Sequence, residues 1–199
     1  GVPRDPIATR LGEDREAIKR LAAKADYLDV LDAIYRRDAH GRPVVSSNRS
    51  LFGLVHPDEQ PLVERIAREV RARIGRKRDT RIVAPLAVGR HVDHQLVRDA
   101  ARRLHRQGYH VVWYEDFPYA EKRGAVTRAR KRFGAGAWSC ATFELDVDEK
   151  IYAIAAYVSQ MKSTFKHTRD MAKRVRAYNR YIAGGEGFAE RVWAFVEGR

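Results

Sequence analysis

The most constraining feature of the sequence is an almost continuous apolar segment, residues 81–89, that runs directly into the start of a polar helix. Such segments are typical of strands buried on both faces of a parallel sheet, because helices cover both faces there. Residues 93–106 then carry apolar side chains at helical spacing, and Gly108 follows as a stop signal. Open α/β sheets place their ligands where a buried strand ends and a helix begins. We therefore expect a functional site at this junction.

Helices and strands alternate along much of the chain. The spacing of apolar residues distinguishes the two, with a period near 3.6 in helices and near 2 in strands. This alternation predicts a layered α/β fold, and no composition shift marks a boundary within residues 1–199. The expected helices cover residues 8–24, 60–74, 93–106, 148–182 and 188–196, and the expected strands cover residues 81–88, 109–114 and 142–147.

The charge of the chain is strongly basic, with 39 Lys and Arg against 26 Asp and Glu, a net charge of +13 and a pI near 10.2. The basic residues are spread over residues 71–81, 122–132 and 162–180. None of these stretches has the interleaved aromatic residues of a base-stacking surface or a Gly-rich RNA-binding signature. The pattern disfavours nucleic acid as the main partner and favours a solvated basic surface that attracts anions.

Cysteine content and hydropathy narrow the class of protein further. The single cysteine, Cys140, excludes an internal disulfide and a cysteine-based zinc site, and it fits a reducing, cytoplasmic compartment. No apolar run approaches the ~20 residues that a membrane span needs. We therefore expect a globular protein without a membrane span, whose oligomeric state the sequence leaves open.

Two histidines and an aspartate follow the buried strand. His91 and His94 are three residues apart, so they share one face of a first helical turn, and Asp93 lies between them. One interpretation is a zinc site in which Asp93 or Asp99 fixes a histidine tautomer. The other is that the three residues only cap a helix. A catalytic zinc needs three protein ligands, so this segment cannot supply a whole site.

These residues and their flanks resemble the PIG-L/LmbE family of zinc-dependent N-deacetylases. The most specific part is residues 85–94, Pro-Leu-Ala-Val-Gly-Arg-His-Val-Asp-His, followed by residues 114–119, Tyr-Glu-Asp-Phe-Pro-Tyr. The resemblance extends to both ends of the chain. Further matching segments are residues 10–14, similar to the family's Arg-x-x-Glu helix, residues 28–32, similar to the strand after it, and residues 155–160 and 189–193, similar to its C-terminal helices.

The resemblance implies a Rossmann-like three-layer sandwich with a mostly parallel sheet, which carries one Zn²⁺ and removes an acyl group, normally acetyl, from an N-acylated sugar or related amine. In the family's pattern the second histidine binds the metal, so His94 inherits that role. His91 would stabilise the oxyanion or donate a proton, and Asp93 would orient His91. Arg10 and Asp32 match positions that contact substrate.

One part of the family's pattern is missing from this sequence. The other two zinc ligands and the general base come from a His-Pro-Asp-Asp-Glu-like motif that should precede Arg10 by several tens of residues. We therefore expect an N-terminally incomplete deacetylase domain that, alone, binds zinc weakly and is inactive.

A similar sequence, His56-Pro57-Asp58-Glu59, lies after the Arg-x-x-Glu helix rather than before it. Capping by Asp58 of the helix that starts near Gln60 explains it. If it were the ligand set instead, His56 and Asp58 would lie within metal reach of His94.

Two alternatives stay open from sequence. Asp116 and Tyr119 follow a strand, where either a substrate contact or local capping and packing explains them. The chain as a whole could also be a non-catalytic relative whose basic surface binds an anionic polymer such as nucleic acid.

Overall fold

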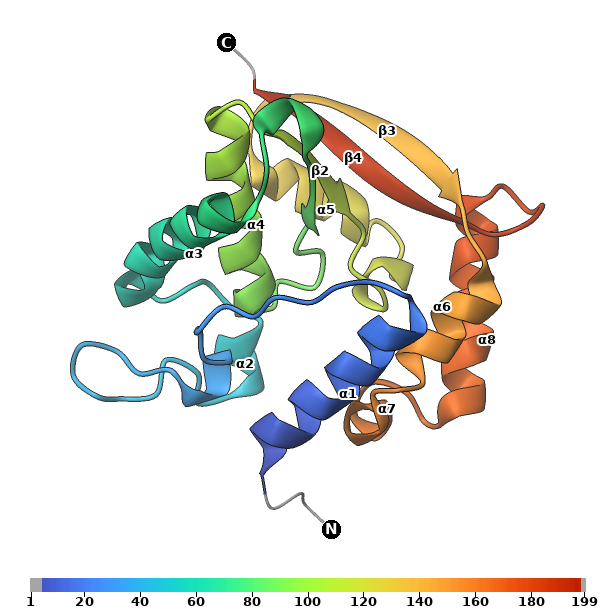
Figure 1. Ribbon diagram of the computed structural model, residues 1–199, viewed down its shortest axis with the longest axis horizontal. Helices are drawn as coiled ribbons and strands as arrows, with labels where there is room; N and C mark the ends of the chain where they lie inside the picture. The colour runs from blue at the N-terminus through green and yellow to red at the C-terminus, as the bar shows by residue number, and fades with distance from the viewer. Residues whose placement is uncertain (1–4, 198–199) are drawn as a thin grey trace. The chain divides into compact units, whose positions relative to one another are not determined.

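The computed structural model describes residues 5–197, which form two compact units (Figure 1). The first, here called the helical unit, comprises residues 5–27 and 142–191. The second, the sheet unit, comprises residues 28–141 and 192–197. No helix among the described residues is both long and apolar enough to cross a membrane.

The helical unit is built around its first helix, α1. Asp5 starts this helix, because its carboxylate accepts hydrogen bonds from the backbone N–H groups of Ile7 and Ala8. Asp14 on α1 accepts hydrogen bonds from the hydroxyls of Tyr157, at 2.6 Å, and Tyr27, at 2.7 Å. The stretch predicted as one helix over residues 148–182 is divided into three. The helices of this unit are α1 (Pro6–Arg20), α6 (Val147–Ile154), α7 (Val158–Thr164) and α8 (Thr168–Ile182).

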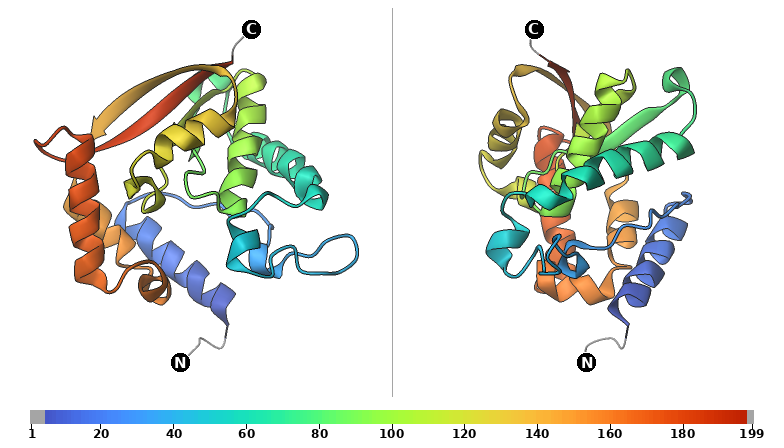
Figure 2. Two further views of the ribbon diagram at one scale, coloured as in Figure 1. Left: turned by 180° about the vertical axis from the view of Figure 1, so that it is seen from behind. Right: turned by 90° about the vertical axis from the view of Figure 1, so that its left-hand side faces the viewer.

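The sheet unit contains the predicted strand–helix–strand segment. Helix α4 packs against strands β1 and β2, and α3 lies alongside α4 (Figure 2). The α4 residues that face this packing are apolar, with Leu96, Ala100 and Leu104 at most 2% exposed. The sheet unit holds α2 (Asn48–Leu51), α3 (Gln60–Arg73), β1 (Arg81–Pro85), α4 (Val92–Arg106), β2 (His110–Tyr114) and α5 (Ala125–Phe133), with 3₁₀ turns at Ala33–Tyr35, Pro57–Glu59, Lys77–Asp79 and Tyr119–Glu121.

The four-stranded sheet is mixed, not mostly parallel as expected. Its order is β1-β2-β4-β3, where β3 is Gly136–Glu144 and β4 is Ala189–Glu197, and both of these strands contribute residues to the two units. Strand β1 pairs with β2 in parallel, with Arg81 opposite His110. Strand β2 pairs with β4 in antiparallel fashion, with Trp113 opposite Trp193. The α/β class is therefore confirmed, and the predicted strand direction is wrong.

The source of this error is the C-terminal segment, which was predicted as a helix over residues 188–196 and is strand β4. Its buried side chains Ala189, Trp193 and Phe195 are an even number of residues apart, which is strand periodicity. Trp193 and Phe195 pack in an aromatic cluster that no helix-spacing argument anticipates. The cluster consists of Trp113, Phe133, Trp138, Trp193 and Phe195, with ring centroids 4.7–6.5 Å apart.

One smaller prediction is also wrong. Residues 28–32 form no strand, and Asp32 instead caps the 3₁₀ turn Ala33–Tyr35. The strand expected over residues 142–147 is confirmed as β3, an edge strand of the sheet, with bounds shifted to Gly136–Glu144.

Candidate active site

The predicted strand-to-helix junction lies at one edge of the sheet unit. Because β1 and β2 are parallel neighbours, their carboxyl ends meet at the same edge. The connection from β1 to α4 places Ala87 and Arg90 at φ angles of 57° and 64°. L-residues rarely adopt such left-handed backbone, and it concentrates at functional sites. The hydrogen bond from Arg90 N–H to Ala87 O, at 3.1 Å, closes this turn.

His91 is the N-cap of α4. Its Nδ1 accepts the backbone N–H of Asp93 at 3.3 Å, so the ring proton resides on Nε2. Burial lowers the pKa of His91 below its ordinary value, and the nearby His94 lowers it further, against the opposing effect of Asp93 and Asp32. The Phe52 ring packs edge-on at a centroid distance of 5.6 Å. His91 is therefore favoured as a neutral imidazole with a donor at Nε2.

The Asp93 carboxylate is held by Arg36, whose side chain is 10% exposed. The Oδ1 of Asp93 lies 2.6 Å from Nη1 of Arg36, and its Oδ2 accepts the backbone N–H of Ala33 at 3.3 Å. Arg36 also pairs through Nε with the buried Glu59. Burial opposes the charge on Arg36, but Glu59 and Asp93 outweigh it and raise its pKa. The Asp93 Oδ2 to His91 Nδ1 distance is 3.9 Å, so the backbone of Asp93, not its carboxylate, contacts the His91 ring.

His94 is paired with the buried Asp116. Its Nδ1 lies 2.5 Å from Oδ1 of Asp116, which is 1% exposed. The other Asp116 oxygen accepts the backbone N–H of Val88 at 3.0 Å, which fixes the carboxylate. A carboxylate bound at Nδ1 selects the tautomer with a free lone pair at Nε2. His94 lies beside His91, at a ring centroid distance of 5.2 Å.

Tyr119 and Gly89 form one wall beside these histidines. The Tyr119 ring lies 6.1 Å from the His94 ring, centroid to centroid. It packs so closely on Gly89 that a Cβ there would lie 2.3 Å from its Cγ. Burial raises the pKa of Tyr119, and the charge of Asp116 raises it further. A glycine is therefore required at position 89, in the connection between β1 and α4.

The donor chemistry of His94 fits one ligand of a zinc ion. Neutral imidazole with a carboxylate on its other nitrogen is a common zinc ligand arrangement. Among residues 5–197, no group of three His, Cys, Asp or Glu side chains could hold a metal ion together. The role of His94 as a zinc ligand stays a prediction.

The His56-Pro57-Asp58-Glu59 segment contributes nothing to that donor set within the described residues. His56, not Asp58 as expected, is the cap: its Nδ1 accepts the N–H of Asp58 at 3.3 Å. Asp58 instead accepts the backbone N–H of Ala39 at 2.9 Å. The predicted cap on the helix that starts near Gln60 is therefore wrong: α3 has no side-chain cap, and His56 caps the 3₁₀ turn Pro57–Glu59 that precedes it.

The two predicted substrate contacts lie in different units. Asp32 is in the sheet unit, close enough to His91 to affect its pKa, and its carboxylate accepts the N–H of Ile34. Arg10 lies on α1 in the helical unit. Both roles stay predictions.

Sequence reasoning missed Arg36 and Glu59 and left Asp116 open. One signal could have found the Asp116 pairing: His94 and Asp116 follow neighbouring parallel strands, whose carboxyl ends coincide. No local signal marks Arg36, because its partners Glu59 and Asp93 are 23 and 57 residues away.

The sequence is similar to two curated deacetylases. It is 37% identical over 120 residues to a 2'-N-acetylparomamine deacetylase of Niallia circulans, covering 57% of this chain and 41% of that protein. It is 35% identical over 127 residues to a 2'-N-acetylparomamine deacetylase of Streptomyces fradiae, covering 56% of this chain and 46% of that protein. The matched part is thus less than half of either relative. No family model matches the chain.

Solved structures of deacetylases share the fold over almost the whole chain. The zinc-inhibited form of a teicoplanin deacetylase matches with a TM-score of 0.79 and 25% identity, covering 98% of this chain and 76% of that one. A deacetylase complex from the teicoplanin biosynthesis pathway matches with a TM-score of 0.77 and 25% identity, covering 98% and 75%. Together with the curated relatives, these similarities support the resemblance to PIG-L/LmbE N-deacetylases.

Proposed function

We propose that this chain forms part of a zinc-dependent PIG-L/LmbE-type hydrolase that removes an acetyl group from an N-acylated amino sugar or related amine. The observation that carries the proposal is the pair of neighbouring imidazoles on α4, with His94 fixed by the buried Asp116. Capping of a helix requires only one of these histidines, and His91 already provides it. The His94–Asp116 pair needs another purpose, and the deacetylases that resemble the chain supply one.

His94 would hold the metal ion through Nε2, with Asp116 keeping the ring in that tautomer. Bound zinc polarises an amide carbonyl and lowers the pKa of a water molecule, which suits amide hydrolysis at neutral pH. Within residues 5–197, His94 is the residue to which we assign the metal.

His91 would act on the substrate rather than on the metal. Its Nε2–H can donate to the carbonyl oxygen, where negative charge develops during attack. The lowered pKa keeps the ring neutral near pH 7, so that one proton is placed at Nε2 and the Nδ1 position is occupied by the Asp93 N–H contact. Arg36 holds Asp93, and through it the first turn of α4. Arg10 and Asp32 would contact the substrate.

Acetate release by the full-length protein tests this function. The substrates are 2'-N-acetylparomamine and N-acetylglucosamine, assayed with one equivalent and with excess Zn²⁺, because one similar structure is described as zinc-inhibited. His94→Ala should reduce activity by more than about 100-fold, since even partners of metal ligands contribute 10–100-fold. His56→Ala is the matched control and should retain activity, because His56 only caps a turn.

Two results would contradict the proposal. One is metal-independent acetate release that His94→Ala leaves unchanged. The other is full-length protein that contains no metal after purification, binds none on titration, and releases no acetate from either substrate.

A further inference from the structure

Gln95 is a buried polar side chain next to the candidate site, and the proposed function gives it no role. It follows His94 on α4 and is 7% exposed. Its Nε2 donates to the carbonyl oxygen of Gly53 at 2.9 Å and to that of Arg90 at 2.6 Å. Both partners are acceptors, so only the NH₂ end of the amide can face them. Gln95 therefore joins two segments that are 37 residues apart in the sequence.

The first of these segments is the turn between β1 and α4. Arg90 lies in this turn with a φ of 64°, which L-residues rarely adopt. Strained backbone of this kind persists only where its surroundings hold it. The N–H of Arg90 donates to the carbonyl oxygen of Ala87 at 3.1 Å, and the carbonyl oxygen of Arg90 accepts from Gln95. The turn is thus fixed on both sides of the residue that precedes His91.

The second segment is the end of α2. This helix has four residues, none of them buried, so apolar burial contributes little to holding it in place. Two donors converge instead on the carbonyl oxygen of Gly53, namely Nε2 of Gln95 and, at 3.3 Å, Nη2 of Arg90. The backbone here is tight, because a Cβ on Gly53 would lie 2.8 Å from the carbonyl oxygen of Arg49. These hydrogen bonds therefore attach the end of α2 to the turn that leads into α4.

Phe52 is the side chain that this attachment places. It directly precedes Gly53, and its ring packs edge-on to His91, at 5.6 Å between centroids, and to Tyr119, at 5.9 Å. Tyr119 lies 6.1 Å from His94, and His94 lies 5.2 Å from His91, so the four rings form a closed circuit of contacts. The His91 ring accepts a hydrogen bond at Nδ1, and the Phe52 contact adds a second constraint on its orientation.

We propose that Gln95 is a positioning residue for His91, acting through Phe52. Its two hydrogen bonds hold the end of α2 on the turn between β1 and α4, and this seats the Phe52 ring against the imidazole that would donate to the carbonyl oxygen of the substrate. A donor lowers the barrier only if it is already in place where negative charge develops, and a displacement of about 1 Å can cost roughly 100-fold in rate. The effect on hydrolysis rests on the proposed function, whereas the placement of Phe52 on His91 does not.

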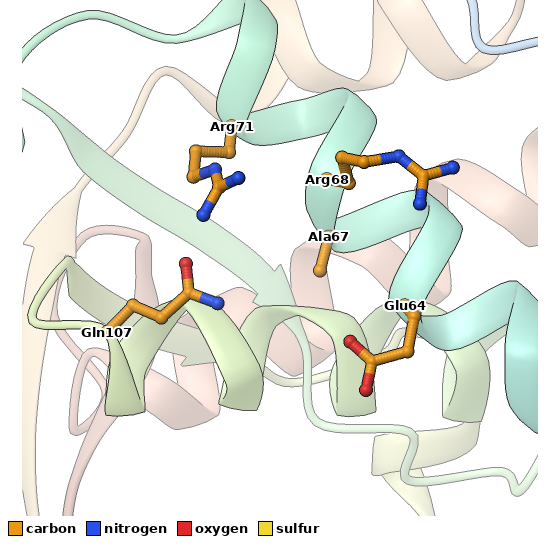
Figure 3. Close-up of a pocket in the computed structure, with 5 residues that line it drawn as sticks. All are labelled: Glu64, Ala67, Arg68, Arg71 and Gln107. Carbon is orange, nitrogen blue, oxygen red and sulfur yellow. The ribbon is translucent and has the colours of Figure 1, made fainter.

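Gln107 provides a matched control at the other end of α4. It is the C-cap of that helix, and its side chain is exposed. Together with Arg71 and Glu64 it lines a pocket of about 210 Å³ between α3 and α4 (Figure 3). The change Gln107→Met removes an amide that water can solvate, so it should leave α2 and Phe52 undisturbed.

NMR on the chain itself tests the placement of Phe52. Gln95→Met keeps the length of the side chain and removes both donors. The NOE between the Phe52 and His91 rings should be present in the wild-type chain and in Gln107→Met, and lost in Gln95→Met. In the wild-type chain, the side-chain amide protons of Gln95 should exchange with solvent at least about tenfold more slowly than those of Gln107, because they are buried and hydrogen-bonded. If Gln95→Met does not fold, Gln95→Asn, whose amide is one methylene too short to reach both carbonyls, serves instead.

Kinetics of the full-length protein test the consequence for hydrolysis. Gln95→Met should lower kcat for acetate release by about tenfold or more. It should change KM by less than about twofold, because His91 would act on charge that develops only in the transition state. Gln107→Met should change neither constant. A merely structural role of Gln95 would lower the yield of folded protein and leave kcat per folded molecule unchanged.

The outcomes separate this proposal from the proposed function. An NOE that persists in Gln95→Met would overturn the placement. A lost NOE with an unchanged kcat, or equal losses of kcat in Gln95→Met and Gln107→Met, would overturn the positioning role. If the wild-type protein releases no acetate while the NOE is lost in Gln95→Met, the deacetylase function fails and the placement of Phe52 by Gln95 stands.

Discussion

Two short segments of the sheet unit, His56-Pro57-Asp58 and His91-Val92-Asp93, have the same local structure and different surroundings. In each, the histidine caps a helical turn and its Nδ1 accepts the N–H of the aspartate two residues on, at 3.3 Å in both cases. The side chains of His56 and Asp58 themselves are 36% and 39% exposed. The second segment is enclosed by Arg36, Phe52 and the His94–Asp116 pair. Both segments therefore have the same local capping structure. The candidate chemistry of the second segment comes from the tertiary contacts around it.

Replacing Arg36, which holds Asp93, should lower the stability of the protein more than the other substitutions discussed below. Arg36→Met leaves the buried Glu59 and the partly buried Asp93 without their cation. Removing one member of a buried ion pair costs about 3–5 kcal/mol, so we expect the free energy of unfolding in urea to fall by about 3 kcal/mol. The control Arg78→Met removes the partner of Asp79 from a pair whose side chains are 74% and 63% exposed, and should cost under about 0.5 kcal/mol. Equal losses in the two variants would show that the Arg36 network is ordinary surface pairing.

Asp116→Asn should have an intermediate effect on stability and a specific effect on His94. The amide oxygen can still accept the N–H of Val88, but the amide NH₂ cannot accept from His94 Nδ1–H. We expect a loss of about 1.5 kcal/mol and a change of the His94 tautomer, with the proton moving to Nε2. Long-range ¹H–¹⁵N correlation spectra of the ring nitrogens measure this directly.

Asp58→Asn is the matched control for this second change. The Asp58 carboxylate only accepts the N–H of Ala39, which an amide oxygen can do equally well. The free energy of unfolding should change by under about 0.5 kcal/mol. An unchanged His94 tautomer in Asp116→Asn would mean that Asp116 does not orient the ring.

Sequence reasoning located the junction because its signals are local. The apolar run before Gly89 and the helical spacing after His91 predict β1 and α4 within a few residues of their observed bounds. Strand β4 was mispredicted because Val192, Trp193 and Val196 fit a helical spacing as well as a strand. Its buried residues are set by pairing with β2, a partner about 80 residues away, and a short window of sequence does not contain that information.

In the candidate site, too, sequence reasoning found the residues marked by local signals and missed those that depend on long-range contacts. His91, Asp93 and His94 are adjacent in sequence and carry a family resemblance, so they were identified. Arg36 and the pairing of Asp116 with His94 depend on how loops return to the sheet edge.

The smallest expected difference between the His56-Pro57-Asp58 and His91-Val92-Asp93 segments is in how their contributions to stability depend on pH. Burial and His94 lower the pKa of folded His91, whereas an unfolded histidine has a pKa of about 6.5. Below that pH the unfolded chain binds the proton more readily than the folded one. The His91 contribution to stability is therefore complete above about pH 6.5 and is lost as the pH falls from there toward the lower folded pKa.

Urea unfolding of chelator-treated protein between pH 7.5 and 5 measures this dependence. His91→Gln should reduce the drop in the free energy of unfolding between pH 7.5 and 5 by under about 1 kcal/mol. His56→Gln is the control, made at the capping histidine of the exposed segment. Phe52→Ala should bring the His91 pKa back toward its ordinary value in an NMR titration, because it opens the ring to water. A His91 ring that titrates at or above pH 6.5 in the wild-type chain would remove the electrostatic distinction between the two capping histidines, and with it the reason to place a neutral donor at Nε2 of His91.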